Sequence, residues 1–479
     1  MSVAFPTWED KDHGVQLYLG DCLEVLPTLE PGSVDAVVTD PPYGLGFMGK
    51  DWDHGIPGSH FWEAVLTVAK PGAHLLAFGG TRTFHRLACA IEDAGWEIRD
   101  CIMWVYGSGF PKSEDASKAI DRQACREELT ANLGRKPTRE EFKAEWENYR
   151  KIVGTKLGLP GYSLTNATDQ GNTLGWSKSK RDGAKECSIS TPFASAAAQW
   201  SGWGTALKPA WEPVIVARKP LDGTVADNVQ RYGTGAMNID GCRVRGGSSD
   251  GGSISGLSAL GQGSGWNAHT NRTTAIDRSM GKGRWPANLI HDGSEEAVAG
   301  FPQTGMSAGG RSGHTAAYSG GYKQEYYGNE HPGFGDSGSA ARFFYCAKAS
   351  RTDRNEGLGG FQEKPLNWSS GTKSPETFQA EGTKRRAKNH HPTVKPTALM
   401  QYLCRLVTQP GGIILDPFMG SGSTGRAAML EGFRFVGIDN DPECLPMARA
   451  RIRAAIVDHK TDMFRQAEVE QPTLFESED

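Results

Sequence analysis

The sequence has few of the features that mark a secreted, membrane or metal-binding protein. Its nine cysteines are an odd number and include no Cys-x-x-Cys pair, so neither a disulfide framework nor a recognisable zinc site is expected. No apolar run reaches the roughly 20 residues that a membrane-spanning helix needs. The first residues, Met1–Phe5, lack the basic and apolar regions of a signal peptide. We therefore expect a cytoplasmic protein with no metal ligands.

A strong charge of either sign is also missing. The chain has 52 Lys and Arg against 56 Asp and Glu, a formal net charge of −4, which argues against a uniformly basic surface. Any binding of nucleic acid must therefore use local patches. The run Lys384–Lys388 is one such patch, and a solvated surface loop is its alternative interpretation.

The length of 479 residues predicts a catalytic core with at least one substantial appendage. From residue 15 to residue 109, short apolar runs alternate with helical stretches, as in parallel α/β units. Four strands are expected at Val15–Gly20, Val34–Thr39, Ala73–Phe78 and Ile98–Tyr106, and two helices at Phe61–Ala69 and Thr83–Ala94.

The middle of the chain is less regular. Two surface helices are expected at Ala124–Leu133 and Arg139–Tyr149, a polar loop over Leu157–Trp200, and a strand at Pro213–Arg218. From Gly246 to Ala340 the sequence is rich in Gly, Ser, Asn and His with no persistent period. We expect that stretch to be disordered, or ordered only on a ligand, apart from packed islands near Arg284–Ile290 and Arg342–Cys346.

A last folded block is expected from His391 to Ile456. It contains a strand at Ile413–Leu415, a glycine loop with its helix, a strand at Phe433–Ile438 and a helix at Glu443–Ile456. The polar tail beyond it is expected to fray.

The glycine loop, Asp416–Gly425, carries the spacing Gly-x-Gly-x-x-Gly between a strand and a helix. Glycines there let the backbone approach a cofactor, and Asp439, at the end of the next strand, is placed to bind ribose hydroxyls. A nucleotide-bearing cofactor is therefore predicted. A phosphate-binding P-loop is disfavoured because Arg426 stands where that motif needs lysine.

The position of this loop predicts how the sheet is assembled. Only about 55 residues follow the loop, too few for the rest of a doubly wound domain. The missing strands must precede it, so we expect both ends of the chain to complete one sheet.

A second motif, Asp40-Pro41-Pro42-Tyr43, follows the strand Val34–Thr39, where open α/β sheets hold their ligands. An exocyclic amine is a poor nucleophile because its lone pair is delocalised into the ring. The Asp40 carboxylate and the Pro41 carbonyl are placed to accept its two N–H groups, and Tyr43 to stack on a flipped base. The alternative interpretation is a tight turn after a strand.

Together these motifs resemble the amino-methyltransferases of DNA with the permuted, or beta-class, motif order, and in particular the site-specific methylases of phages and prophages. The resemblance covers Val15–Tyr106, Trp203–Arg243 and His391–Ile456. It implies an α/β, Rossmann-like, S-adenosylmethionine-dependent methyltransferase sheet, circularly permuted, with an inserted irregular target-recognition region. The departures from the family pattern are the insertion Lys112–Trp200 and the Gly/Ser-rich stretch after Arg245.

The resemblance also implies the roles of residues. Asp21 would contact the adenine of S-adenosylmethionine, Asp439 its ribose, and Thr393 with Lys395-Pro396 its methionine end. The implied catalytic residues are Asp40, Pro41, Pro42 and Tyr43. The implied cofactor-binding residues are Asp21, Cys22, Phe78, Gly79, Thr393, Lys395, Pro396, Asp416, Pro417, Phe418, Gly420, Ser421, Gly422 and Asp439. The candidate DNA-binding residues are Arg243, Arg245, Arg284, Lys384, Arg385 and Arg386.

Six segments follow from this interpretation. They are residues 1–111 (catalytic corner), 112–200 (insertion), 201–220 (last catalytic strand), 221–390 (target recognition), 391–457 (cofactor loop) and 458–479 (flexible tail).

The predicted reaction is methylation of adenine N6 in double-stranded DNA, because Asp at the first position of the Pro-Pro-Tyr motif usually accompanies adenine and Ser cytosine N4. Methylation of cytosine N4 is an alternative. Three other functions are also alternatives: an amide methyltransferase, a catalytically silent DNA-binding relative and an NAD-linked oxidoreductase. The sequence contains no Pro-Cys nucleophile of the kind that attacks a ring carbon, so a covalent route is not expected. A homodimer and a restriction endonuclease partner are compatible with the sequence, as is a solitary methylase.

Overall fold

The computed structural model describes residues 5–45, 55–107, 109, 113–149, 152–158, 185–190, 194–244, 284–304, 310–311, 330–331, 338–347, 352–365, 386–391 and 393–470. They fall into two compact units. The first unit draws on both ends of the chain, and the second lies within residues 108–210. Three residues with predicted DNA contacts, Arg245, Lys384 and Arg385, lie outside the described residues.

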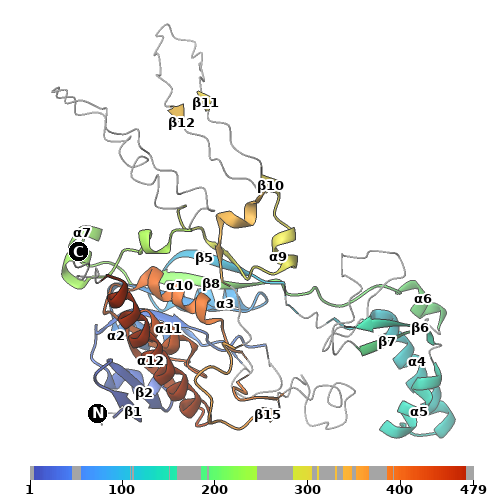
Figure 1. Ribbon diagram of the computed structural model, residues 1–479. Coiled ribbons are helices and arrows are strands. Elements are labelled where there is room, and N and C mark those ends of the chain that lie inside the picture. Colours follow the sequence, from blue (N-terminus) through green and yellow to red (C-terminus); the bar gives the residue numbers. More distant parts are fainter. Residues whose placement is uncertain are drawn as a thin grey trace, which may run out of the picture. The chain divides into compact units, whose positions relative to one another are not determined.

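A ten-stranded sheet forms the centre of the first unit (Figure 1). In spatial order its strands are β1 (Trp8–Asp10), β2 (Val15–Leu19), β18 (Arg434–Asp439), β17 (Ile413–Asp416), β3 (Val34–Thr39), β4 (Ala69–Phe78), β8 (Trp211–Arg218), β5 (Glu97–Val105), β9 (Leu289–His291) and β14 (Tyr345–Cys346). The two C-terminal strands β17 and β18 lie between the N-terminal strands β3 and β2, and all four are parallel. The prediction that both ends of the chain complete one sheet is confirmed.

Helices cover both faces of this sheet. The core on one face includes α10 (Thr397–Val407), α11 (Ser423–Leu430) and α12 (Cys444–Glu470), and the core on the other includes α1 (Cys22–Val25), α2 (Ser59–Val68) and α3 (Phe84–Asp93). Neighbouring strand residues alternate between the two cores: Leu76 belongs to the first and Leu75 to the second. Every residue of β3 is buried, as expected for a strand covered on both sides. The predicted α/β class is confirmed.

The carboxyl ends of the parallel strands meet at one edge, the carboxyl edge. Strand β8 pairs antiparallel with β4 and β5, so its first residues, Trp211 and Glu212, lie at the same edge. The edge therefore brings together chain segments that follow β2, β3, β4, β17 and β18 with the segment that precedes β8. Most of the predicted site residues are in these segments.

Several elements differ from the expectations. Strand β4 begins at Ala69 and helix α4 (Ala116–Leu133) starts earlier than expected; α5 (Arg139–Tyr149) has its expected bounds. The segment predicted to be a polar loop includes most of the strand pair β6 (Ile152–Gly158) with β7 (Lys185–Ser190), and helix α6 (Ser195–Gln199). Helix α12 runs to Glu470, past the end expected near residue 456.

The Gly/Ser-rich stretch also contains regular structure where it is described. Strand β9 extends the central sheet beside β5, and helix α9 (Glu295–Ala299) follows it. The other short elements are η1 (Leu26–Thr28), α7 (Val225–Tyr232), η4 (Asp240–Cys242), β10 (Gln303–Thr304), β11 (Gly310–Arg311), β12 (Glu330–His331), β13 (Gly338–Ser339), η5 (Ala340–Phe343), β15 (Lys364–Pro365) and β16 (Arg386–Ala387). Among the described helices, none is long and apolar enough to span a bilayer.

Candidate functional site

The glycine loop connects β17 to α11 and requires glycine at two positions. Gly420 and Gly422 have φ angles of +53° and +77°, a left-handed conformation that side chains make costly. A Cβ atom on Gly420 would lie 3.0 Å from Nε2 of His391, and one on Gly422 would lie 2.8 Å from Cβ of Ala448. Both the turn and its close packing therefore depend on the absence of side chains.

Ser421, between these glycines, is held by residues that the motifs did not identify. Its hydroxyl accepts hydrogen bonds from Asn389 Nδ2 at 3.1 Å and from the Arg451 guanidinium at 3.2 Å, and its carbonyl accepts from Arg451 at 2.9 Å. Arg451 is fully buried, and burial lowers its pKa to about 10. Because Ser421 is only 3% exposed, its side chain fixes the loop within the protein. No sequence pattern indicated Arg451 or Asn389.

Asp416 likewise connects elements of the protein. Its carboxylate accepts hydrogen bonds from the hydroxyls of Thr39 at 2.7 Å and Thr424 at 2.6 Å, and from the backbone N–H of Phe418 at 3.2 Å. It therefore joins the ends of β3 and β17 to α11. Burial raises its pKa to about 7, against the effect of these hydrogen bonds. The Phe418 ring packs near Trp62, with ring centroids 6.2 Å apart.

Asp439, at the end of β18, lies directly beside the loop. Its carboxylate accepts the backbone N–H of Gly420 at 2.6 Å and that of Asp441 at 2.8 Å. The backbone N–H of Gly20 bonds to the carbonyl of Asp439 at 2.9 Å, which brings Asp21 to the neighbouring strand end. Burial raises the pKa of Asp439 above its usual value.

Two adjacent residues after β2, Asp21 and Cys22, were both assigned to the cofactor but have different surroundings. Asp21 is exposed and caps α1 by accepting the backbone N–H of Leu23 at 2.9 Å. Cys22 is buried in the core, and burial raises the pKa of its thiol to about 12. The Cys22 side chain is therefore a core residue.

The Asp-Pro-Pro-Tyr segment follows β3 and forms a polar cluster that we call the corner: Asp40, Tyr43, Glu212 and Lys395. The Lys395 ammonium donates to Asp40 Oδ2 at 2.6 Å, and the Tyr43 hydroxyl donates to Asp40 Oδ1 at 2.8 Å. Glu212 Oε2 lies 3.2 Å from the Tyr43 hydroxyl and 3.4 Å from the Lys395 nitrogen. Two carboxylates thus face one ammonium group. Of the four, the motifs named Asp40, Tyr43 and Lys395 and missed Glu212.

The charges of the corner shift the pKa values of its donors. Burial alone would lower the pKa of the Lys395 ammonium, but the negative charges of Asp40 and Glu212 outweigh it and raise that pKa above its usual value. Burial and the same two carboxylates raise the pKa of the Tyr43 hydroxyl well above its usual value. Lys395 and Tyr43 therefore remain protonated donors near neutral pH.

Aromatic and backbone groups surround the corner. The Lys395 nitrogen lies 4.8 Å from the centroid of the buried Phe78 ring, which ends β4. The hydroxyl of Thr83 donates to the Tyr43 carbonyl at 2.7 Å. The backbone N–H of Gly79 bonds to the carbonyl of Pro213 at 2.9 Å, so the segments after β4 and within β8 are joined.

His391 links the corner to the glycine loop. It begins the segment that leads through Thr393 and Pro396 into α10, and its Nδ1 lies 3.1 Å from the Thr393 carbonyl. Burial lowers its pKa to about 4, so the ring is neutral and Nδ1 must carry the hydrogen. Its Nε2, the atom closest to the position that a Cβ on Gly420 would occupy, then has a free lone pair.

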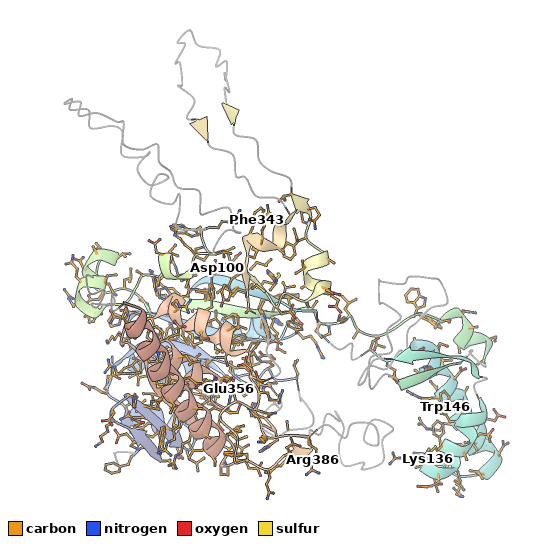
Figure 2. All side chains as sticks on the ribbon, viewed as in Figure 1. Asp100, Lys136, Trp146, Phe343, Glu356 and Arg386 are labelled. Carbon is orange, nitrogen blue, oxygen red and sulfur yellow. The ribbon has the colours of Figure 1, made fainter. Side chains whose placement is uncertain are left out.

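The described arginines that were candidates for DNA contact bind within the protein. Arg243 pairs with Asp240 at 2.9 Å and lies over the Trp285 ring. Arg284 lies over the ring of Phe343, which Figure 2 labels. Arg386, also labelled there, is exposed and donates to the Glu363 carbonyl at 2.9 Å. None of the three is brought to the corner by a contact among the described residues.

Comparison with known proteins supports the family resemblance. Residues 267–450 match the family model described as DNA methylase, N6_N4_Mtase. This match, over less than half of the chain, supports the resemblance to the N6/N4 DNA methylases. The matched residues include Lys395 and the glycine loop. Asp40 lies outside them and accepts a hydrogen bond from Lys395.

Similar proteins match this chain in part. The type II methyltransferase M2.DpnII of Streptococcus pneumoniae is 48% identical over 64 residues, 13% of this chain and 24% of the relative. YubD of Escherichia coli K12 is 48% identical over 58 residues, 12% of this chain and 26% of the relative. The matches thus span about a quarter of the length of these curated relatives. The solved cytosine-N4-specific PvuII DNA methyltransferase is 13% identical, with a TM-score of 0.36, over 91% of this chain and 86% of its own.

Proposed function

We propose that this chain is a site-specific DNA methyltransferase that uses S-adenosylmethionine to methylate the exocyclic amine of a flipped base, adenine N6. The observation that carries the proposal is the juxtaposition at one sheet edge of an acidic Pro-Pro-Tyr corner and a glycine loop flanked by Asp439. The corner has the acceptors that an aromatic amine needs, and the glycine loop with Asp439 has the acceptors that a nucleoside needs. The match of residues 267–450 to the N6/N4 DNA methylase family model supports both assignments.

The residues around the glycine loop fit S-adenosylmethionine. Gly420 and Gly422 let the loop take a left-handed turn that a cofactor can approach through its backbone. Asp439 and Asp21 place two carboxylates at adjacent strand ends. Carboxylates there are acceptors for ribose hydroxyls and for an adenine amine. His391 Nε2 offers a further acceptor beside the loop. When bound, the cofactor supplies a methyl group on a positively charged sulfur. Other residues were also assigned to the cofactor. Four of them hold the glycine loop or the core in place through the contacts described above: Ser421, Asp416, Phe418 and Cys22. The others belong to the chain segments next to the loop and the corner: Thr393, Pro396, Phe78, Gly79 and Pro417.

The corner has the groups that activation of an aromatic amine requires. An oxygen of Asp40 accepts an N–H of the target amine and draws its nitrogen toward tetrahedral geometry, and the Pro41 carbonyl accepts the other N–H. The nitrogen must lose a proton once it is alkylated, and Asp40 is the acceptor at hand. The excess negative charge of Asp40 and Glu212 stabilises the transient cation. Pro42 fixes the backbone, and the ring of Tyr43 stacks on the base.

Adenine N6 is favoured over cytosine N4 because Asp, and not Ser, occupies the first position of the motif. Both are exocyclic amines with two N–H donors, so the corner suits either chemically. A glutamine-directed amide methyltransferase resembles this site less, since its Asn-Pro-Pro-Tyr corner follows the glycine loop in the chain. An oxidoreductase would leave the corner without a role.

The remaining assignments follow from this function. We propose that residues 221–390 read double-stranded DNA, that the chain order is a circular permutation of the methyltransferase sheet, and that Arg245, Lys384 and Arg385 contribute basic charge. Homodimerisation and pairing with a restriction endonuclease are compatible with this function, and so is a solitary methylase.

The proposal is tested by expressing the chain in a methylase-deficient host and reading its DNA with modification-sensitive single-molecule sequencing. We expect N6-methyladenine in a defined motif, absent with Asp40→Ala. Methylated cytosine would reassign the target to N4. Unmodified DNA from folded wild-type protein would reject DNA methylation.

A further inference from the structure

Glu212 is the one member of the corner that the motif comparison did not assign. It is the second residue of β8 and pairs with Trp104 of β5 in the sheet. Because β8 is antiparallel, its first residues lie at the edge where Asp40 follows the parallel strand β3. Glu212 therefore reaches the corner from a strand that is distant in sequence from both sequence motifs.

Asp40 and Glu212 compete for the same two donors. The single proton of the Tyr43 hydroxyl has Asp40 Oδ1 at 2.8 Å and Glu212 Oε2 at 3.2 Å. The Lys395 nitrogen has Asp40 Oδ2 at 2.6 Å and Glu212 Oε2 at 3.4 Å. Both shorter contacts go to Asp40, so each of its oxygens accepts one hydrogen bond. Glu212, which also accepts a hydrogen bond from the Tyr106 hydroxyl, is a second acceptor within reach.

This arrangement makes the target amine compete for Asp40. The amine needs an oxygen of Asp40, and each oxygen already accepts one hydrogen bond, so the amine must share that oxygen with Lys395 or Tyr43 or displace one of them. The side chain of Lys395 is 8% exposed. If the amine displaced Lys395 and no other carboxylate were near, the buried ammonium would keep only the neutral Tyr43 hydroxyl, 3.2 Å away. It would lose its anionic partner, which is strongly unfavourable. Glu212 supplies that other carboxylate.

We propose that Glu212 is a positioning residue that takes over Lys395 and the Tyr43 hydroxyl when the target amine occupies an oxygen of Asp40. The proposal rests on the proposed methyl transfer. Glu212 does not touch the transferred methyl group. It frees Asp40 without leaving Lys395 unpaired, and it keeps Tyr43 oriented by an alternative acceptor.

The first experiment compares Glu212→Gln, which removes the charge, with Glu212→Asp, which keeps it. Glu97→Gln is the matched control, because Glu97 pairs with Arg218 at the opposite end of the same β5–β8 strand pair. Single-turnover methylation is measured on duplex DNA carrying the target motif, and unfolding is followed by circular dichroism. We expect Glu212→Gln to lower the rate about 100-fold, with KM for DNA nearly unchanged. Glu212→Asp should restore most of the rate, and Glu97→Gln should retain it.

The second experiment does not depend on methyl transfer. The reactivity of Lys395 toward an amine-specific reagent is followed against pH by mass spectrometry. The described polar groups that face its nitrogen are Asp40, Tyr43 and Glu212, with His391 nearby. Because the two carboxylates raise the pKa of Lys395, removing Glu212 should move its titration to lower pH, and Glu212→Asp should reverse the shift.

An unshifted titration in folded Glu212→Gln would overturn the proposal, whatever the rate does. An unchanged methylation rate would also overturn it. If the wild-type protein methylates no DNA, the proposed function fails, while the titration still decides whether Glu212 holds Lys395.

Discussion

Two aspartates at neighbouring strand ends, Asp40 and Asp416, have opposite surroundings. The Asp40 side chain is 20% exposed and contacts an ammonium group. Asp416 is 2% exposed, and two hydroxyls and one backbone N–H donate to it. The motifs name both residues, but only Asp40 has the accessible carboxylate that a substrate needs. Asp416 instead holds the glycine loop to the sheet.

The buried position of Asp416 predicts a pH dependence of stability. Burial raises its pKa from 3.8 to about 7, so the folded chain binds this proton more tightly than the unfolded chain. Its contribution to the free energy of unfolding is therefore largest at low pH and falls as pH rises from about 4 to about 7, by at most about 1.4 kcal/mol per pH unit.

Substitution isolates this contribution. The difference in unfolding free energy between wild type and Asp416→Asn, measured with urea at pH 5 and pH 8, should shift by about 1 to 3 kcal/mol in favour of the variant at the higher pH. A difference independent of pH would mean that Asp416 is not protonated in the folded chain at pH 5.

At the scale of elements, the glycine loop depends both on a left-handed backbone conformation and on close packing. Comparing Gly420 with Gly411 separates the two effects. Gly420 has φ +53° and His391 next to its missing side chain, whereas Gly411, in the turn before β17, has φ +70° and open space. Alanine at either position should lower the free energy of unfolding by about 1 to 2 kcal/mol. Only Gly420→Ala should weaken binding of S-adenosylmethionine, measured by calorimetry. Equal affinities in the two variants would remove the loop from the cofactor site.

Helix α12 holds the same loop through Arg451. Replacing Arg451 by Met leaves the carbonyl and hydroxyl of Ser421 without this donor, which should cost about 1 to 3 kcal/mol of stability and weaken cofactor binding. Arg453→Met, an exposed residue of the same helix whose guanidinium lies over Trp8, is the matched control and should retain affinity. Thermal unfolding and calorimetry of both variants give the comparison. Unaltered cofactor affinity in folded Arg451→Met would show that the loop keeps its conformation without this anchor.

The limits of sequence reasoning follow from the kind of signal each element carries. Strand β3 was predicted with its observed bounds because a nearly continuous run of apolar residues is a strong local pattern, and all six residues of the strand are indeed buried. Strand β9 has three residues and is stabilised by its parallel pairing with β5, which no local pattern shows. Glu212 and Arg451 were missed for the same reason: a charged residue on a strand or a helix resembles a surface residue until its partners are known.

At the scale of the whole molecule, the topology predicts that the second unit is dispensable for the catalytic sheet. Residues 108–210 enter after β5 and leave before β8, and Val105 of β5 pairs directly with Trp211 of β8. Antiparallel neighbours are readily joined by a short hairpin. Replacing residues 108–210 by Asn-Gly would leave a loop of about four residues, a common hairpin length. The strand pair closes in the same register, so the corner and the glycine loop keep their supports.

We therefore expect the shortened chain to fold, to melt within about 5 °C of the full chain and to bind S-adenosylmethionine with similar affinity, by circular dichroism and calorimetry. Aggregation, or a loss of cofactor affinity, would show that the sheet needs the insertion. Methylation of DNA by the same variant in a methylase-deficient host then separates two roles. Retained methylation at the same motif would assign target recognition to residues 221–390, whereas loss of methylation with cofactor binding intact would give the insertion a part in binding DNA.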